Sequence, residues 1–198
     1  MTLSDDQIRE RLAALSDKPQ LNFETMRVAE SFPNLAEAAV LIPLRPGPNG
    51  LEILLTKRSE ALRKHAGQIS FPGGRRDPED DSLIRTALRE TWEEVGIPQE
   101  SVTIYGALLH MPTVTGYSIT AYVGEFSEST ELIANPDEID ELIVAPISEI
   151  SDRRIHRVEQ LQWNDEEFPV HYFDYGRHLV WGATGFMLDE FFRYLGLR

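Results

Sequence analysis

The segment from Gly67 to Ile97, GQISFPGGRRDPEDDSLIRTALRETWEEVGI, constrains the fold more than any other part of the chain. It passes from a short apolar run through a glycine-rich loop into an acidic stretch. Residues 82–95 contain neither proline nor glycine, and Gly96 and Pro98 follow them as helix-ending residues. Side chains that can cap a helix stand at its start: Asp80, Asp81 and Ser82. The segment therefore predicts a strand end, a tight loop and a helix in direct succession.

Three glutamates share one side of this predicted helix. With about 100° of rotation per residue, its mostly apolar face consists of Ile84, Leu88, Thr91 and Val95. Glu90 and Glu94 lie one turn apart beside that face, and Glu93 is next to them. Like charges at this spacing repel by about a few tenths of a kcal/mol per pair. A divalent cation would make the arrangement favourable, because Mg²⁺ and Mn²⁺ prefer carboxylate oxygens. The alternative interpretation is a solvated face of an acidic protein.

The residues before the glutamates favour the metal-binding interpretation. Gly73 and Gly74 precede the helix at a strand end, where a backbone without side chains can approach a ligand closely. Arg89 stands directly before the first glutamate and can orient a carboxylate through charge-assisted hydrogen bonds. A glycine pair followed by an arginine and the glutamates indicates a metal site more specifically than an acidic helix alone does.

Gly74 and the run Arg89–Ile97, RETWEEVGI, together resemble the Nudix box of the Nudix hydrolases, G-x5-E-x7-R-E-U-x-E-E-x-G-U, where U is aliphatic. The chain departs from that pattern in three places. The spacing from Gly74 to Arg89 is one residue longer. The early glutamate is replaced by Asp80 or Asp81. Thr91 occupies an aliphatic position.

A second resemblance lies upstream and indicates one subgroup, the coenzyme A diphosphatases. Their signature is similar to L-L-T-x-R-S followed by R-x3-G-x3-F-P-G-G. This chain has Leu54–Ser59, LLTKRS, then Arg63, Gly67 and Phe71–Gly74, FPGG. The longer spacing before the box arginine is also what we expect of that subgroup. Glu60 stands where the subgroup usually has a small residue.

The resemblance implies an α+β chain with the Nudix fold, an α/β/α sandwich with a mixed β-sheet. It implies one Nudix hydrolase domain over residues 1–198, with an N-terminal helix and lead-in over 1–34 and the core over 35–198. The implied reaction is hydrolysis of coenzyme A or acyl-coenzyme A to 3′,5′-ADP and 4′-phosphopantetheine, or its acylated form, with Mg²⁺ or Mn²⁺ as cofactor. A homodimer is also implied, although no segment of the sequence indicates an interface.

The resemblance also assigns roles to individual residues. Glu90 and Glu94 are the expected metal ligands, and Glu93 is a third ligand or the base that activates water. Arg89 is expected to hold a glutamate in place. The residues expected to shape the loop or bind substrate phosphates are Gly73, Gly74, Arg58, Arg63 and Arg75.

Two acidic pairs have alternative interpretations. Asp80 or Asp81 either takes the role of the early carboxylate or caps the helix. Glu138 or Glu141 either adds a downstream carboxylate to the metal site or belongs to a helix that starts at Pro136, and we favour the helix start.

Charge and composition narrow the class of partner. The formal net charge of -14 argues against nucleic acid, whose binding needs clustered lysine and arginine. A small anionic substrate remains compatible with a local basic group: Lys57, Arg58, Arg63, Lys64, His65, Arg75 and Arg76. The absence of cysteine removes disulfides, thiolate nucleophiles and zinc–thiolate sites. Neither a signal peptide nor a membrane-spanning run is evident, so we expect a cytoplasmic protein without a membrane partner.

The rest of the chain predicts interleaved strands and helices. A helix is expected over 4–15 and a short helical turn over 146–151. Residues 181–185 are expected to lead into a last amphipathic helix. Strands are expected over 36–44, 51–57, 102–110, 118–126 and 142–145, with a hairpin of 153–163 and 168–175. An acidic loop is expected over 128–141.

Three other functions are alternatives to the coenzyme A reaction. The first is a Nudix hydrolase for ADP-ribose, NADH or dinucleoside polyphosphates, and the LLTKRS-to-FPGG signature argues against it. The second is a non-catalytic Nudix ligand sensor, which would have no need to keep all three glutamates. An isoprenoid isomerase of the same fold depends on a cysteine, which this chain lacks.

Overall fold

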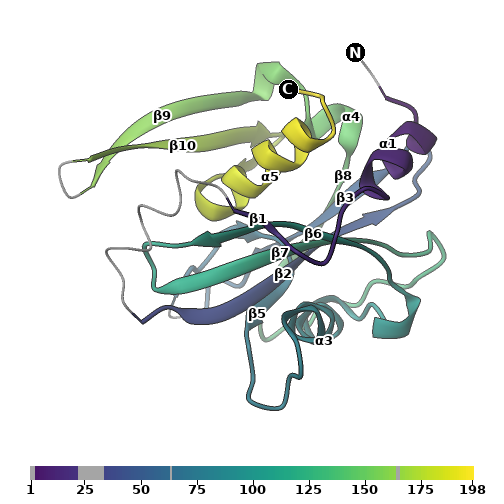
Figure 1. The fold of residues 1–198 in the computed structure, drawn as a ribbon, viewed down its shortest axis with the longest axis horizontal. Coiled ribbons are helices and arrows are strands. Elements are labelled where there is room, and N and C mark those ends of the chain that lie inside the picture. The colour runs from purple at the N-terminus through teal and green to yellow at the C-terminus, as the bar shows by residue number, and fades with distance from the viewer. Residues whose placement is uncertain (1–2, 22–33, 63, 164–165) are drawn as a thin grey trace.

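Two β-sheets and their surrounding helices make up the residues that the computed structural model describes, which are 3–21, 34–62, 64–163 and 166–198 (Figure 1). Within these ranges the large sheet consists of β1 (Gln20–Leu21), β2 (Ala36–Arg45), β3 (Glu52–Arg58), β4 (Ile69–Ser70), β5 (Gly73–Arg75), β6 (Thr103–Pro112), β7 (Tyr117–Glu125) and β8 (Ile139–Pro146). The small sheet consists of β9 (His156–Trp163), β10 (Glu166–Tyr175) and β11 (His178–Val180). The helices are α1 (Asp5–Leu12), α3 (Leu83–Val95), α4 (Ile147–Ile150) and α5 (Gly182–Tyr194), with 3₁₀ turns η1 (Gln99–Ser101) and η2 (Arg153–Ile155).

The large sheet is mixed. β2 runs parallel to β7, from the pair Ala36–Tyr117 to the pair Leu44–Glu125, and antiparallel to β3 and β5. β3 also pairs with β8 in the antiparallel sense. In Figure 1, α3 lies on one side of this sheet, and α1 and α5 lie on the other. The predicted α+β architecture, with a mixed sheet between helices, is confirmed.

Strand β2 is buried on both faces, which explains its nearly continuous apolar sequence. Val40 and Ile42 belong to the core that includes side chains of α1 and α5. Ala39 and Leu41, which alternate with them, belong to a second core that includes Ala87 of α3. Because successive side chains of a strand point to opposite faces, a strand covered by helices on both sides has little need for polar residues.

Helix α3 begins and ends where its sequence predicts. The Ser82 hydroxyl accepts a hydrogen bond from the Arg85 N–H, and Gly96 ends the helix in the left-handed conformation, with φ of 76°. Ala87, Thr91 and Val95 are buried against the sheet. The other predicted apolar positions, Ile84 and Leu88, pack partly buried against the core formed with β2.

The other predicted helices and strands are present with small shifts in their bounds. These are α1, β2, β3, β6, β7, α4, the β9–β10 hairpin and α5. The sequence did not predict β1, which pairs in parallel with β6 at Gln20–Leu109. Residues 22–33 of the predicted lead-in and 164–165 of the hairpin turn lie outside the described residues. No helix in the described ranges combines the length and apolarity that crossing a membrane requires.

The predicted helix start at Pro136 was wrong, because residues 136–138 form a turn that leads into a strand. The Asn135 side chain accepts a hydrogen bond from the Asp137 N–H, and the Asn135 carbonyl accepts from the Glu138 and Ile139 N–H groups. β8 then begins at Ile139 rather than at 142, because it pairs with β3 as far as Arg58. Pairing with a distant strand, which the local sequence does not reveal, decides this segment.

Helix α5 approaches β10 closely at Gly185. A Cβ atom at this position would lie 2.3 Å from the His171 carbonyl oxygen, which is backbone and has little freedom to move. Alanine in place of glycine within a helix normally stabilises a protein by about 0.5–1 kcal/mol. We expect Gly185→Ala to do the opposite and lower the free energy of unfolding by about 1–3 kcal/mol, measured by urea denaturation. A neutral or stabilising effect would contradict the close approach.

Candidate active site

The glycine pair of β5 lies directly against the acidic face of α3. The Gly73 N–H donates a hydrogen bond to Glu94 Oε2 at 3.2 Å. A Cβ atom on Gly74 would lie 2.5 Å from the carboxylate carbon of Glu90. A Cβ atom on Gly73 would instead meet the backbone of β2, so a side chain at either position would disturb the strand or displace the Glu90 carboxylate.

Glu94 is a buried carboxylate, with only 2% of its surface exposed. Burial raises the pKa of Glu94 to about 8, and the negative charges of Glu90 and Glu138 add to the rise. The Gly73 N–H and the Arg58 guanidinium oppose it. A cation close to this carboxylate would stabilise its ionised form.

Glu90 shares this environment. Burial raises the pKa of Glu90 despite a hydrogen bond from Arg89, and the charges of Glu93 and Glu138 contribute to the rise. The charges of Glu90 and Glu138 thus act on Glu94, and the charge of Glu138 also acts on Glu90, beside the glycine pair. Clustered carboxylate oxygens are the donor set of a hard divalent cation, so these residues fit Mg²⁺ or Mn²⁺.

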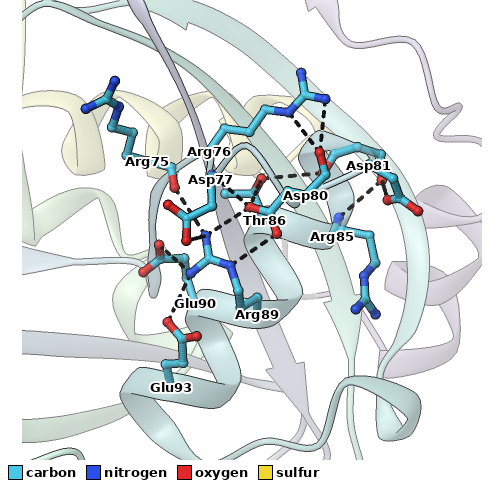
Figure 2. Close-up of polar contacts among 11 residues, drawn as sticks. Arg75, Arg76, Asp77, Asp80, Asp81, Arg85, Thr86, Arg89, Glu90 and Glu93 are labelled. Atoms are coloured by element: carbon cyan, nitrogen blue, oxygen red, sulfur yellow. Dashed lines mark hydrogen bonds and ion pairs between the residues drawn. The ribbon is translucent and has the colours of Figure 1, made fainter.

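Arg89 is the centre of a hydrogen-bond network that links the loop to the glutamates (Figure 2). Its guanidinium donates to Glu90 Oε1 at 2.9 Å and to Glu93 Oε2 at 3.0 Å. It also donates to both carboxylate oxygens of Asp80, at 3.1 and 2.9 Å, and to the Arg75 carbonyl at 3.2 Å. Arg89 therefore contacts two glutamates at once, Glu90 and Glu93.

The structure separates Asp80 from Asp81. Asp80 is buried, and Arg89 holds its pKa well below the usual range, with further hydrogen bonds from the Asp77 N–H and the Thr86 hydroxyl. Asp81 is exposed and accepts a hydrogen bond only from Ser82 among the described residues. Ser82 caps the helix, so neither aspartate does. Of the two aspartates, Asp80 is thus the one that contacts Arg89.

Thr86 is a residue of the site that the sequence did not predict. Its hydroxyl donates to Asp80 Oδ2 at 2.9 Å from a fully buried position on α3. Its position could have indicated a role in the site, because Thr86 lies one helical turn before Glu90. It is also a polar residue on the buried side of the helix.

The arginines predicted to bind phosphates have different surroundings. Arg58 is engaged with the acidic site, since its Nη1 donates to Glu94 Oε1 at 3.3 Å. Arg75 is exposed, its side chain points away from the Arg89 network in Figure 2, and it has no side-chain partner in the described part of the chain. Arg63 lies outside the described residues. Arg75 is therefore free to meet an incoming anion, whereas Arg58 would have to leave Glu94.

The two downstream carboxylates also differ. Glu138 is partly buried and its charge acts on both Glu90 and Glu94. Glu141 is paired elsewhere, with Arg177 at 2.6 Å and with His178 at 3.4 Å. Of the two, Glu138 is the residue that adds negative charge to the acidic site.

The order of these groups along the chain matches a known family. The model of the NUDIX domain matches residues 35–174, which include the glycine pair, Arg89 and all the glutamates of the site. This chain belongs to the Nudix family. As a Nudix hydrolase it acts on pyrophosphate bonds, and binding of divalent metal is typical of the family.

Relatives and solved structures agree with this assignment. The "Uncharacterized Nudix hydrolase NudL" of Citrobacter koseri is 40% identical over 186 residues, which are 91% of this chain and 90% of that relative. The protein of the same name from Photorhabdus laumondii is 38% identical over 159 residues, 79% of this chain and 83% of that relative.

The solved MutT protein of Methanosarcina mazei has a TM-score of 0.53 at 22% identity, covering 81% of this chain and 93% of its own. The MutT/nudix family protein of Enterococcus faecalis also has a TM-score of 0.53, at 15% identity, covering 99% and 76%. These two structures support the Nudix fold.

Proposed function

We propose that this Nudix hydrolase cleaves the diphosphate of coenzyme A or acyl-coenzyme A, giving 3′,5′-ADP and 4′-phosphopantetheine or its acylated form. The observation that carries the proposal is the contact between Arg58 and Glu94 at 3.3 Å. Arg58 belongs to the LLTKRS segment and Glu94 to the Nudix box. The segment that resembles the coenzyme A subgroup therefore borders the acidic site, where it can take part in choosing the substrate.

In this proposal Glu90 and Glu94 hold a divalent cation, Mg²⁺ or Mn²⁺, and Glu138 adds negative charge next to them. The cation supplies charge neutralisation at the diphosphate and acidifies water. Glu93, whose side chain is 44% exposed, is the third ligand or the base that takes a proton from the attacking water. Its exposure lets it reach water, and its bond to Arg89 fixes the direction of its carboxylate.

The chain's positive groups then act on the substrate. Arg75 is exposed beside the glycine loop and is placed to bind a phosphate of the nucleotide part. Arg58 binds the diphosphate once Glu94 is no longer its partner. Arg89 stays in the network with Asp80 and keeps Glu90 and Glu93 aligned during the reaction.

Identification of products by mass spectrometry tests the substrate. The purified chain is incubated with coenzyme A, acetyl-coenzyme A, NADH and ADP-ribose, each with and without Mn²⁺. We expect 3′,5′-ADP and 4′-phosphopantetheine from coenzyme A, only when the metal is present. A Glu90→Gln preparation run in parallel identifies activity from a contaminant.

Two other outcomes would replace the proposal. Cleavage of NADH or ADP-ribose with coenzyme A left intact would assign another nucleoside diphosphate derivative as the substrate. Binding of a nucleotide with no cleavage of any compound in the panel would favour the ligand sensor.

A further inference from the structure

A second group of metal-ligating side chains lies between the small sheet and α5. His156 of β9, His171 of β10 and Asp189 of α5 each offer one ligand atom, and these atoms all lie within 4.8 Å of one another. In Figure 1 the β9–β10 hairpin and α5 are on the side of the large sheet opposite α3. The group is therefore separate from the carboxylates of the Nudix helix.

The separations between the ligand atoms suit a small cation with tetrahedral ligands. His156 Nε2 is 3.1 Å from His171 Nδ1 and 3.7 Å from Asp189 Oδ1. His171 Nδ1 is 3.5 Å from Asp189 Oδ2. Two ligand atoms that are each about 2.0–2.1 Å from a tetrahedral Zn²⁺ are about 3.3 Å apart. The observed separations lie on both sides of that value, so side-chain adjustments suffice.

Asp189 carries a second and independent sign of a missing partner. Its side chain is almost completely buried, and Oδ1 has no hydrogen-bond partner among the described residues. The other oxygen, Oδ2, accepts a hydrogen bond from Arg193 Nε at 2.5 Å. A buried acceptor without a donor destabilises a fold unless something satisfies it. Oδ1 is on the side of Asp189 that faces His156.

Two guanidiniums already face Asp189. Arg193 Nε donates a hydrogen bond to Oδ2. Arg198 Nε lies 3.7 Å from Asp189 Oδ1 and competes with a cation for that oxygen. The two guanidiniums weaken the site without removing its ligands.

We propose that His156, His171 and Asp189 bind one zinc-class cation, which joins the β9–β10 hairpin to α5. Two imidazole nitrogens and one carboxylate oxygen favour Zn²⁺ over Mg²⁺. Binding requires His156 Nε2 and His171 Nδ1 both to present a lone pair, so the proton in their 3.1 Å contact has to move to the other nitrogen of the same ring. Gly185, one turn before Asp189, lets α5 approach the His171 backbone closely enough to form the site. The position far from α3 assigns the ion a stabilising role rather than a catalytic one.

Zinc titration in the presence of excess Mg²⁺ tests this site, because Mg²⁺ occupies carboxylates and does not compete for imidazole. The chain is first freed of metal with a chelator. We expect one equivalent of zinc to be retained by elemental analysis, and the Tm to rise by about 5–10 °C at saturating zinc. The imidazole ¹⁵N signals of His156 and His171 should shift on binding, whereas that of His110 should not.

Two variants separate this site from the proposed active site and from chance binding. His156→Gln should lose the zinc and the Tm rise. His110→Gln, which removes an imidazole bonded to Thr120 on another sheet, should keep both. Glu90→Gln should also keep both while losing hydrolysis. Equal zinc content in the wild type and His156→Gln, or unshifted ring signals in the wild type, would overturn the proposal.

Discussion

Replacing Glu94 by glutamine is expected to lower the rate of pyrophosphate hydrolysis by about a thousandfold or more, equivalent to about 4 kcal/mol of transition-state stabilisation. Glu94 is buried between the Gly73 N–H and the Arg58 guanidinium. Glutamine keeps the size of the side chain and an acceptor oxygen for one of the two donors. It removes the negative charge that would hold a divalent cation. Measurement of kcat over a range of Mn²⁺ concentrations checks this result.

The matched control is Glu100→Gln, which removes one negative charge from an exposed residue of η1. We expect its kcat and metal dependence to equal those of the wild type. Thermal melting of both variants shows whether they remain folded. If Glu94→Gln kept hydrolysis within about tenfold of the wild type, the assignment of Glu94 as a metal ligand would be wrong.

Replacing Asp80 by alanine is expected to lower the free energy of unfolding by about 2–4 kcal/mol. Asp80 is buried and accepts hydrogen bonds from the Arg89 guanidinium, the Thr86 hydroxyl and the Asp77 N–H. Its removal leaves Arg89 Nε and the Asp77 N–H without an acceptor. Arg89 also loses the support that aligns it with the glutamates, so hydrolysis should fall by about tenfold to a hundredfold. Urea denaturation and steady-state kinetics measure the two effects.

Asp81→Ala is the control, because the neighbouring aspartate is exposed and does not contact Arg89 in the described structure. Its effect on stability should stay within about 0.5 kcal/mol, with unchanged kinetics. Equal effects of the two substitutions would mean that the loop adopts another arrangement. A further measurement separates the positioning of Arg89 from a general loss of stability. Mild denaturant that lowers the stability of the wild type as much as Asp80→Ala does should leave the kcat of the wild type unchanged.

Local patterns were sufficient to predict much of the fold. The limits of α3 follow from Ser82, which caps it, and Gly96, which ends it. The apolar runs over 36–44 and 51–57 predicted two strands, and these are present as β2 and β3, which pair at Leu44–Ile53. In each case the deciding interaction lies within a few residues, so the sequence carries it directly.

The details of the site depend on contacts between distant segments, which a single sequence does not reveal. Asp80 and Asp81 are neighbours of the same type, and only burial beside Arg89 distinguishes them. Glu138 joins the acidic site because β8 pairs with β3, the same pairing that replaces the predicted helix start at Pro136. Arg58 was expected to face a phosphate, yet in the described structure it faces Glu94.

The two glycines of β5 impose different limits on how this protein can evolve. A Cβ at Gly73, where φ is +152°, would lie 2.4 Å from the Ala39 carbonyl oxygen, so any replacement disturbs the backbone of the sheet. At Gly74 the obstacle is the Glu90 carboxylate, which can swing aside. In a library of random variants, selection for abundance should therefore eliminate changes at 73, whereas changes at 74 should survive it and disappear only under selection for turnover.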